Sequence, residues 1–312
     1  MLPSRDTSVT HLDPSSLPTI EAIEAPPSHP RRKKGLGIGA WLAIVWVGGL
    51  ALVAALAPLL PFIPDPNESF PEIARQGPGN GHLLGGDAIG RDLLARIVYG
   101  TRSSFIVGFG AVAFGLLLGG ILGLVTGFFR GKVDSIITPL MNVLLAIPQF
   151  VLALSLVTVL ATGEGVGSFR RLGVVVLGLG LVSIPLLGRI TRANTLAWSE
   201  REFVLASRAM GAKNWRIMLR EVLPNVVPAM LSIALLGVGI AIVAEGGLSL
   251  FGVGVQLPTP SWGNIIAEGR DQMRRAPHIV IFTSLILFLT VMALNYLGDV
   301  VSRRFGVRES VL

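Results

Sequence analysis

The residues best suited to do chemistry in this 312-residue chain lie in one polar, basic segment, EFVLASRAMGAKNWRIMLREVLP at 202–224. Long apolar runs flank the segment on both sides. Apolar residues recur within it at the i, i+3 and i+4 spacing of one helix face, while Arg208 and Lys213 occupy other faces. The apolar positions are Phe203, Ala206, Met210, Ala212 and Trp215. This pattern predicts recognition of a protein partner by a helix laid into a groove.

Helix-ending residues divide the segment into a pair of short amphipathic helices. Gly211 predicts a sharp C-terminal cap for the first helix, and Leu223-Pro224 predicts the end of the second. The alternative is an interfacial helix that rests on lipid headgroups. The small pair Ala206-Ser207 favours the protein partner, because a groove requires close approach whereas lipid favours bulky apolar residues.

Side chains that catalyse reactions or bind metals are sparse. His82 and His278 are isolated, His11 and His29 lie near the N-terminus, and the chain has no cysteine. No G-x-x-x-x-G-K-[ST] motif is present, so we expect no ATP site, metal or cofactor in this chain. Neither a membrane-embedded enzyme nor an autonomous secondary transporter is favoured, because catalytic groups and intramembrane carboxylates are missing from the apolar runs.

Composition places the chain in a membrane. Hydrophobic residues make up 51% of the sequence and charged residues only 14%. Six charge-free runs are long enough to span a bilayer. They run from Lys34 to Asp65, Arg102 to Arg130, Asp134 to Glu164, Arg171 to Arg189, Glu221 to Glu245, and Arg275 to Asp299. Since backbone groups find no partner in lipid, the predicted class is all-α, with six transmembrane helices.

Basic residues orient these spans. The cluster at 31–34 directly precedes the first span and should stay in the cytoplasm. Six crossings return the C-terminus to the same side, and every lysine then lies inside. The net charge of +7 does not indicate nucleic-acid binding, because the cations flank the spans and form no basic soluble domain.

The predicted organisation follows from these spans. It comprises a disordered cytoplasmic tail at 1–34, a first transmembrane helix at 35–62, an external segment with an amphipathic helix at 63–101, a five-helix core at 102–302, and a cytoplasmic tail at 303–312. Within the core, 196–225 is the cytoplasmic loop and 251–276 is an external loop. The amphipathic helix is predicted from Leu93, Leu94, Ile97 and Val98.

Small residues and prolines mark how the spans pack. Gly115, Gly119, Gly123 and Gly127 recur every fourth residue of the second span and predict close helix contact. Packing within the chain is favoured over a subunit contact. Pro148 predicts a kink in the third span, of the kind found in both static and moving bundles.

Two residues near the outer ends of the spans are predicted to lie at the membrane interface. Glu245 should face a polar interior or lie near the outer interface, and we favour the interface over a substrate contact. Trp262, in a loop made rigid by neighbouring Pro and Gly, carries the amphipathic ring typical of that interface.

The loop resembles the cytoplasmic EAA loop of permease subunits of ATP-binding-cassette importers, whose pattern is EAA-x3-G-x9-I-x-LP. Ala206, Gly211 and Leu223-Pro224 match, whereas Leu205, Ser207 and Glu221 stand where the pattern has Glu, Ala and Ile. Two further blocks, LLGGDAIGRDLLARIVYGTRSSFIVG at 83–108 and LSLFGVGVQLPTPSWGNIIAEG at 248–269, resemble the dipeptide, oligopeptide and nickel permease family. The match covers 83–269 and is closest to the second, C-type permease of the pair.

This resemblance implies a type I importer fold in the inner membrane of a prokaryote. The implied partners are a sibling permease, two cytoplasmic ATPase subunits that bind ATP and Mg, and an external solute-binding protein. The chain would form half of the pathway for peptides, with nickel or another small solute as the alternative. The residues implied to couple ATPase motion to transport are Phe203, Ala206, Ser207, Met210, Gly211, Ala212, Leu223 and Pro224.

Overall fold

The computed structural model describes residues 37–161 and 168–305. The tail predicted to be disordered at 1–34 lies outside the described residues, as does most of the predicted C-terminal tail at 303–312. All of the described helices belong to the unit of the chain that begins at Ile38.

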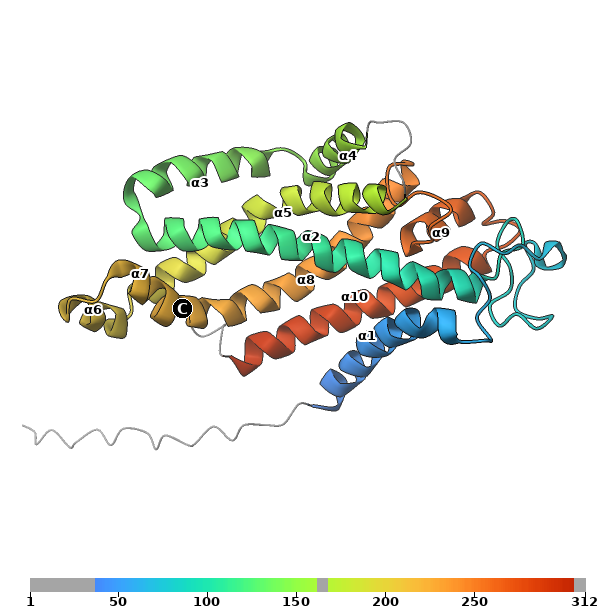
Figure 1. The fold of residues 1–312 in the computed structure, drawn as a ribbon, viewed down its shortest axis with the longest axis horizontal. Coiled ribbons are helices and arrows are strands. Elements are labelled where there is room, and N and C mark those ends of the chain that lie inside the picture. Colours follow the sequence, from blue (N-terminus) through green and yellow to red (C-terminus); the bar gives the residue numbers. More distant parts are fainter. Residues whose placement is uncertain (1–36, 162–167, 306–312) are drawn as a thin grey trace, which may run out of the picture. The chain divides into compact units, whose positions relative to one another are not determined.

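The described chain is helical and contains no sheet, only isolated bridges in the segment before residue 93. The helices are α1 (Ile38–Leu56), α2 (Leu93–Phe129), α3 (Gly131–Ala146), α4 (Gln149–Leu160), α5 (Ser168–Ser199), α6 (Glu202–Ala209), α7 (Asn214–Ile217), α8 (Leu223–Leu250), α9 (Trp262–Arg270) and α10 (His278–Arg304) (Figure 1). Short 3-10 turns lie at Ala57–Leu59 and Pro71–Ile73, and a π-helical stretch at Met218–Val222. The all-α prediction is confirmed.

Five helical segments of the described chain are long and apolar enough to cross a membrane. They are Ile38–Leu59, Leu93–Phe129, Arg170–Ser199, Asn214–Leu250 and His278–Arg304. The third predicted span corresponds to α3 and α4, which meet at 92°. Counting this bent pair as one span gives the six predicted crossings.

Pro148 therefore breaks its span completely, where the sequence predicted only a kink. Pro148 precedes the first residue of α4 and cannot donate a backbone N–H. The Gln149 side chain compensates by donating from Nε2 to the carbonyl oxygens of Leu144 at 3.3 Å and Ile147 at 3.2 Å. Such compensation is needed because lipid offers no donor to the carbonyls that a break leaves free.

Helix α2 begins earlier than the charge pattern indicated. The segment 93–101, predicted as a separate external helix, forms the first turns of α2, which continues to Phe129. Asp92 caps the helix by accepting from the backbone N–H of Ala95 at 2.7 Å. Arg102 does not end it, because its guanidinium donates to the carbonyl oxygens of Ala54 and Ala55 in α1.

The glycine stripe of α2 packs against α5 of the same chain. A methyl group at Gly119 would overlap the carbonyl oxygen of Ile184, and one at Gly123 would overlap that of Gly188. Gly115 and Gly127 likewise lie directly against α5. All four backbones approach α5 so closely that only hydrogen fits between them.

Helix α8 connects two regions of contrasting character. The α6 end comprises residues 199–223, and the α9 end comprises residues 63–96 and 245–276. Figure 1 shows α6 and α7 at one end of α8 and α9 at the other. Along its length α8 lies against α10, where Ser232 Oγ donates to the carbonyl oxygen of Gly298 at 2.7 Å.

Candidate docking site at the α6 end

Helix α6 is a single short amphipathic helix with charges that suit its dipole. Glu202 lies in its first turn and Arg208 in its last, so each charge opposes the partial charge of the nearer helix end. Gly211 follows in the left-handed conformation with φ of +81°, which an L side chain adopts only with strain. The chain then reverses into α7 without any side chain crowding Gly211.

The end predicted at Leu223-Pro224 is wrong. Helix α7, the π-helical stretch and α8 form one helical segment from Asn214 to Leu250. The π-helical turn shifts the backbone bonds ahead of Pro224 out of the usual i to i−4 pattern, so the missing N–H of Pro224 does not end the helix. The Asn225 side chain also donates to the carbonyl oxygen of Glu221 at 2.6 Å.

One apolar side chain anchors α6 to the rest of the chain. Val204 is fully buried and belongs to a cluster with Leu124 and Phe128 of α2 and with Ile217 and Met218 after the turn. Ala212 and Leu223, both half-buried, pack against the same cluster. The anchored face of α6 is therefore narrow.

The predicted apolar face of the segment points away from the chain. Phe203 is 41% exposed, Met210 79% and Trp215 61%. Ala206 and Pro224 are also exposed. Because water penalises exposed apolar area, several large exposed apolar side chains on a polar loop favour a protein partner.

Polar contacts stabilise the segments that surround α6. Arg130 Nη2 lies 2.8 Å from Glu200 Oε1, and the Arg208 guanidinium lies 5.3 Å from the centre of the Phe128 ring, as a cation–π contact. These residues line an open groove of about 630 Å³ beside α6. Ser207 Oγ donates to Glu221 Oε1 at 2.9 Å, which joins α6 to the stretch before α8.

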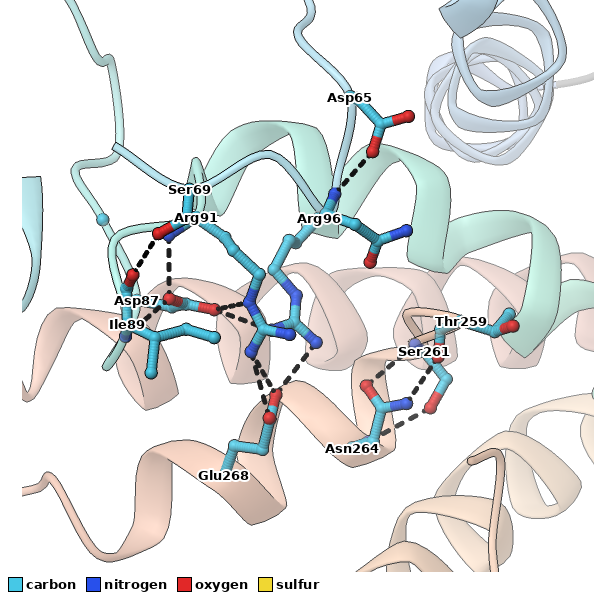
Figure 2. A network of polar contacts seen from close by, with 12 residues as sticks. Asp65, Ser69, Asp87, Ile89, Arg91, Arg96, Thr259, Ser261, Asn264 and Glu268 are labelled. Atoms are coloured by element: carbon cyan, nitrogen blue, oxygen red, sulfur yellow. Dashed lines mark hydrogen bonds and ion pairs between the residues drawn. The ribbon is translucent and has the colours of Figure 1, made fainter. Parts of the chain in front are cut away.

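The α9 end contains a buried charge cluster that sequence analysis missed. Asp87 Oδ2 lies 2.6 Å from Arg96 Nη1 and also pairs with Arg91 Nε, and Glu268 of α9 pairs with both arginines at 3.0 and 2.9 Å (Figure 2). Arg96 is fully buried. Burial raises the pKa of the Glu268 carboxyl, and the charge of Arg91 opposes this shift. The signal that could have found the cluster is the unusual density of charge in GGDAIGRDLLAR.

Glu245 and Trp262 lie in the interior of the protein, so both interface predictions are wrong. Glu245 Oε1 accepts from Ser249 Oγ at 2.7 Å and from Ser261 Oγ at 2.9 Å. Trp262 is fully buried, and its Nε1 donates to the carbonyl oxygen of Ile97 at 3.1 Å. Ser261 caps α9 together with Asn264. Glu245 thus binds the start of α9 to α8 (Figure 2 shows Ser261 and Asn264).

His82 and His278, the histidines among the described residues, make contacts within the fold. His82 Nδ1 lies 2.6 Å from Asp92 Oδ2, and His278 Nε2 lies 3.0 Å from the carbonyl oxygen of Gly86. Among residues 37–161 and 168–305, no group of three or more His, Cys, Asp or Glu side chains is arranged to hold a metal ion.

Comparison with protein families shows the family to which this chain belongs. Residues 115–308 match the family described as binding-protein-dependent transport system inner membrane component. The chain belongs to this family. It is a multi-pass permease subunit of an ABC importer in the inner membrane.

Curated relatives of this permease cover most of its length. It is 38% identical over 236 residues to the glutathione transport system permease protein GsiD of Pectobacterium atrosepticum, covering 76% of this chain and 74% of that protein. It is 34% identical to the dipeptide transport system permease protein DppC of Alkalihalophilus pseudofirmus, covering 86% and 84%. It is 35% identical to the di/tripeptide transport system permease protein DppC of Pseudomonas aeruginosa, covering 85% and 86%.

A solved structure shares the fold. A chain of the MetNI methionine ABC transporter in an inward-facing conformation superposes with a TM-score of 0.57 at 19% identity, covering 68% of this permease and 97% of that chain. The prediction of a type I importer permease fold is therefore confirmed.

Proposed function

We propose that this permease forms half of a translocation pathway for small peptides and transmits ATPase motion to it through the segment 202–224. A sibling permease supplies the other half. Two ATPase subunits, which themselves bind ATP and Mg, dock at the α6 end. A solute-binding protein docks at the α9 end. The chain itself holds no ATP site, in keeping with the absence of a P-loop motif from the sequence.

The observation that carries this proposal is the outward apolar face of α6 and the turn after it. Phe203 on α6, Met210 at the C-terminal end of α6 and Trp215 on α7 are exposed, and Val204 is the buried residue that holds α6 to the chain. A helix presenting apolar anchors at helical spacing is the form that a partner groove binds. Coupling then requires that the ATPase pair favours one position of this helix over another when nucleotide is bound.

The orientation of the chain follows from the same proposal. ATPase subunits act in the cytoplasm, so the α6 end and both termini lie there, and the α9 end faces outward. The basic residues before the first span support this orientation.

The substrate class rests on the relatives. Their printed names concern glutathione, dipeptides and di- or tripeptides. These solutes share a peptide backbone of two or three residues, so we propose import of short peptides.

Substitution of Gly211 tests the docking role. Gly211→Arg places a bulky, charged side chain at a left-handed position in the middle of the proposed contact. We expect assembly in the membrane together with loss of peptide uptake per ATP hydrolysed, measured in proteoliposomes that contain the complete importer.

Gly131→Arg is the matched control. Gly131 also has a left-handed φ, of +60°, and open space around its Cβ position, but it lies where α3 begins after α2, outside the segment 202–224. Uptake should survive Gly131→Arg. Undiminished uptake with Gly211→Arg would contradict the docking role.

A further inference from the structure

Two of the positions at which this chain departs from the EAA pattern are in contact with each other. Ser207 stands where the pattern has Ala, and Glu221 stands where it has Ile. The Ser207 hydroxyl donates to Glu221 Oε1 at 2.9 Å across 14 positions of sequence. An apolar pair of the pattern is thus replaced by a hydrogen-bonded pair that joins α6 to the stretch before α8.

The surroundings make this hydrogen bond the main polar connection of α6. Both side chains are half-buried, and Glu221 Oε2 is shielded from solvent with no hydrogen-bond partner among the described residues. A carboxylate in such a place depends strongly on the donors it has, because water cannot replace them. Ser207 is the donor to this carboxylate from α6.

Apolar packing also fixes α6 relative to α8, but through a single buried residue of α6. Val204 belongs to a cluster with Val222 and Val226, whereas a side chain added at Gly211 would meet no neighbouring atom. The π-helical stretch that contains Glu221 continues without interruption into α8, which reaches the α9 end. A contact at Glu221 therefore acts on the whole length of α8.

We infer that the Ser207–Glu221 hydrogen bond clamps α6 to α8, so that a displacement imposed on α6 moves α8 as part of the same rigid unit. This inference rests on the proposed function, since it assumes that a partner moves α6. Ser207 and Glu221 are positioning residues in this mechanism. They need not touch the ATPase, because they act by fixing the orientation of α6 relative to α8.

A double-mutant cycle tests the clamp. Ser207→Ala should lower peptide uptake per ATP hydrolysed by about tenfold, because it leaves the shielded carboxylate without its donor and releases α6. Glu221→Ile should lower it less, because a serine hydroxyl can turn to a carbonyl of its own helix. The double variant carries Ala and Ile, the residues of the EAA pattern, and should recover most of the uptake through apolar contact.

The cycle separates a clamp from two independent effects. Recovery in the double variant, with complex assembly equal in all four proteins, supports coupling of the two positions. Uptake in the double variant at or below that of Ser207→Ala alone would overturn the clamp.

Cross-linking gives a second measurement that does not depend on stability. The chain has no cysteine, so Ser207→Cys combined with Glu221→Cys introduces the only thiol pair. Joining the two thiols with a short bifunctional reagent should preserve uptake, because a clamp holds these positions together throughout the cycle. Loss of uptake on cross-linking, restored when a cleavable linker is cut, would show that α6 must move relative to α8.

Failure of the clamp and failure of the docking role are distinguishable. If Gly211→Arg abolishes coupling but the double-mutant cycle is additive, α6 docks the ATPase and the clamp is wrong. If Gly211→Arg leaves uptake intact, the docking role itself is wrong.

Discussion

The α9 end and the α6 end of this permease differ in how much polar structure each buries. At the α9 end, Asp87 and Arg96 are buried and paired, and the buried Glu245 accepts hydrogen bonds from two serine hydroxyls. At the α6 end, Val204 is the buried residue of α6, and large apolar side chains such as Met210 and Trp215 face outward. Large apolar side chains are exposed at both ends, so the contrast lies in the buried polar network that holds the α9 end together and in the narrow anchor that holds α6.

The difference also separates stability from function. Buried charges are costly to leave unpaired, so changes to the buried charge cluster at the α9 end should act mainly on folding. Exposed side chains contribute little to folding, so changes at the α6 end should act mainly on transport. Substitutions at the two ends should therefore differ widely in their effect on the free energy of unfolding.

Removal of Arg96 should have the largest effect. Arg96→Ala removes a fully buried cation that lies between Asp87 and Glu268. The two carboxylates then lose this partner. We expect the free energy of unfolding in detergent to fall by about 3–5 kcal/mol. Arg270→Ala is the control, because the Arg270 side chain is 66% exposed and its pair with Asp271 should be worth less than about 1 kcal/mol.

Filling the glycine stripe should have the next largest effect. Gly123→Ala drives a methyl group into the backbone of α5 at Gly188, which should cost about 1–3 kcal/mol of stability. Gly173→Ala, in α5 with open space at its Cβ position, should be neutral or slightly stabilising because alanine favours helix. Equal thermal unfolding of the two variants would show that the α2–α5 contact tolerates a side chain.

Loss of the α9 cap should be smaller. Ser261→Ala removes both the cap of α9 and one donor to Glu245, so we expect a loss of about 1–2 kcal/mol. Ser155→Ala, which removes an exposed hydroxyl bonded only to the preceding turn, is the comparison. Thermal unfolding measures both, and indistinguishable values would mean that Glu245 does not hold α9.

Truncation of the exposed face at the α6 end should scarcely change stability. Met210→Ala combined with Trp215→Ala should alter the free energy of unfolding by less than about 0.5 kcal/mol, because both side chains face outward. Binding of the ATPase subunits, measured by co-purification, should nevertheless weaken. A stable variant that retains its ATPase subunits would remove the contrast between the two ends.

Much of the fold could be predicted because lipid leaves the backbone few choices. The charge-free runs predicted the helical class and the number of crossings, and the spacing of Gly119 and Gly123 predicted a close contact. Charge was a poor guide to where helices begin. Arg96 and Arg102 lie inside α2 because each finds a partner in the fold, which a single sequence does not reveal.

Other features depended on contacts between distant segments. Ser207 and Glu221 are 14 positions apart, and Arg91 and Glu268 are 177 apart, so no local pattern joins them. Pro224 was expected to end a helix. The π-helical turn before it shifts the backbone hydrogen bonds out of the i to i−4 pattern, so the helix continues although Pro224 has no N–H. The spacing of the apolar residues at 203–215 predicted an amphipathic segment, but only the structure shows that this face points outward.

The accessibility of residue 210 bears on both the orientation of the α6 end and its partner. Met210→Cys introduces the sole thiol of the chain at a docking position whose side chain is 79% exposed. In intact cells, a membrane-impermeant maleimide should fail to label this variant. After the membrane is opened, labelling should occur only when the ATPase subunits have been stripped away. Labelling from outside intact cells, or equal labelling with and without the ATPase subunits, would refute the docking of an ATPase at this end.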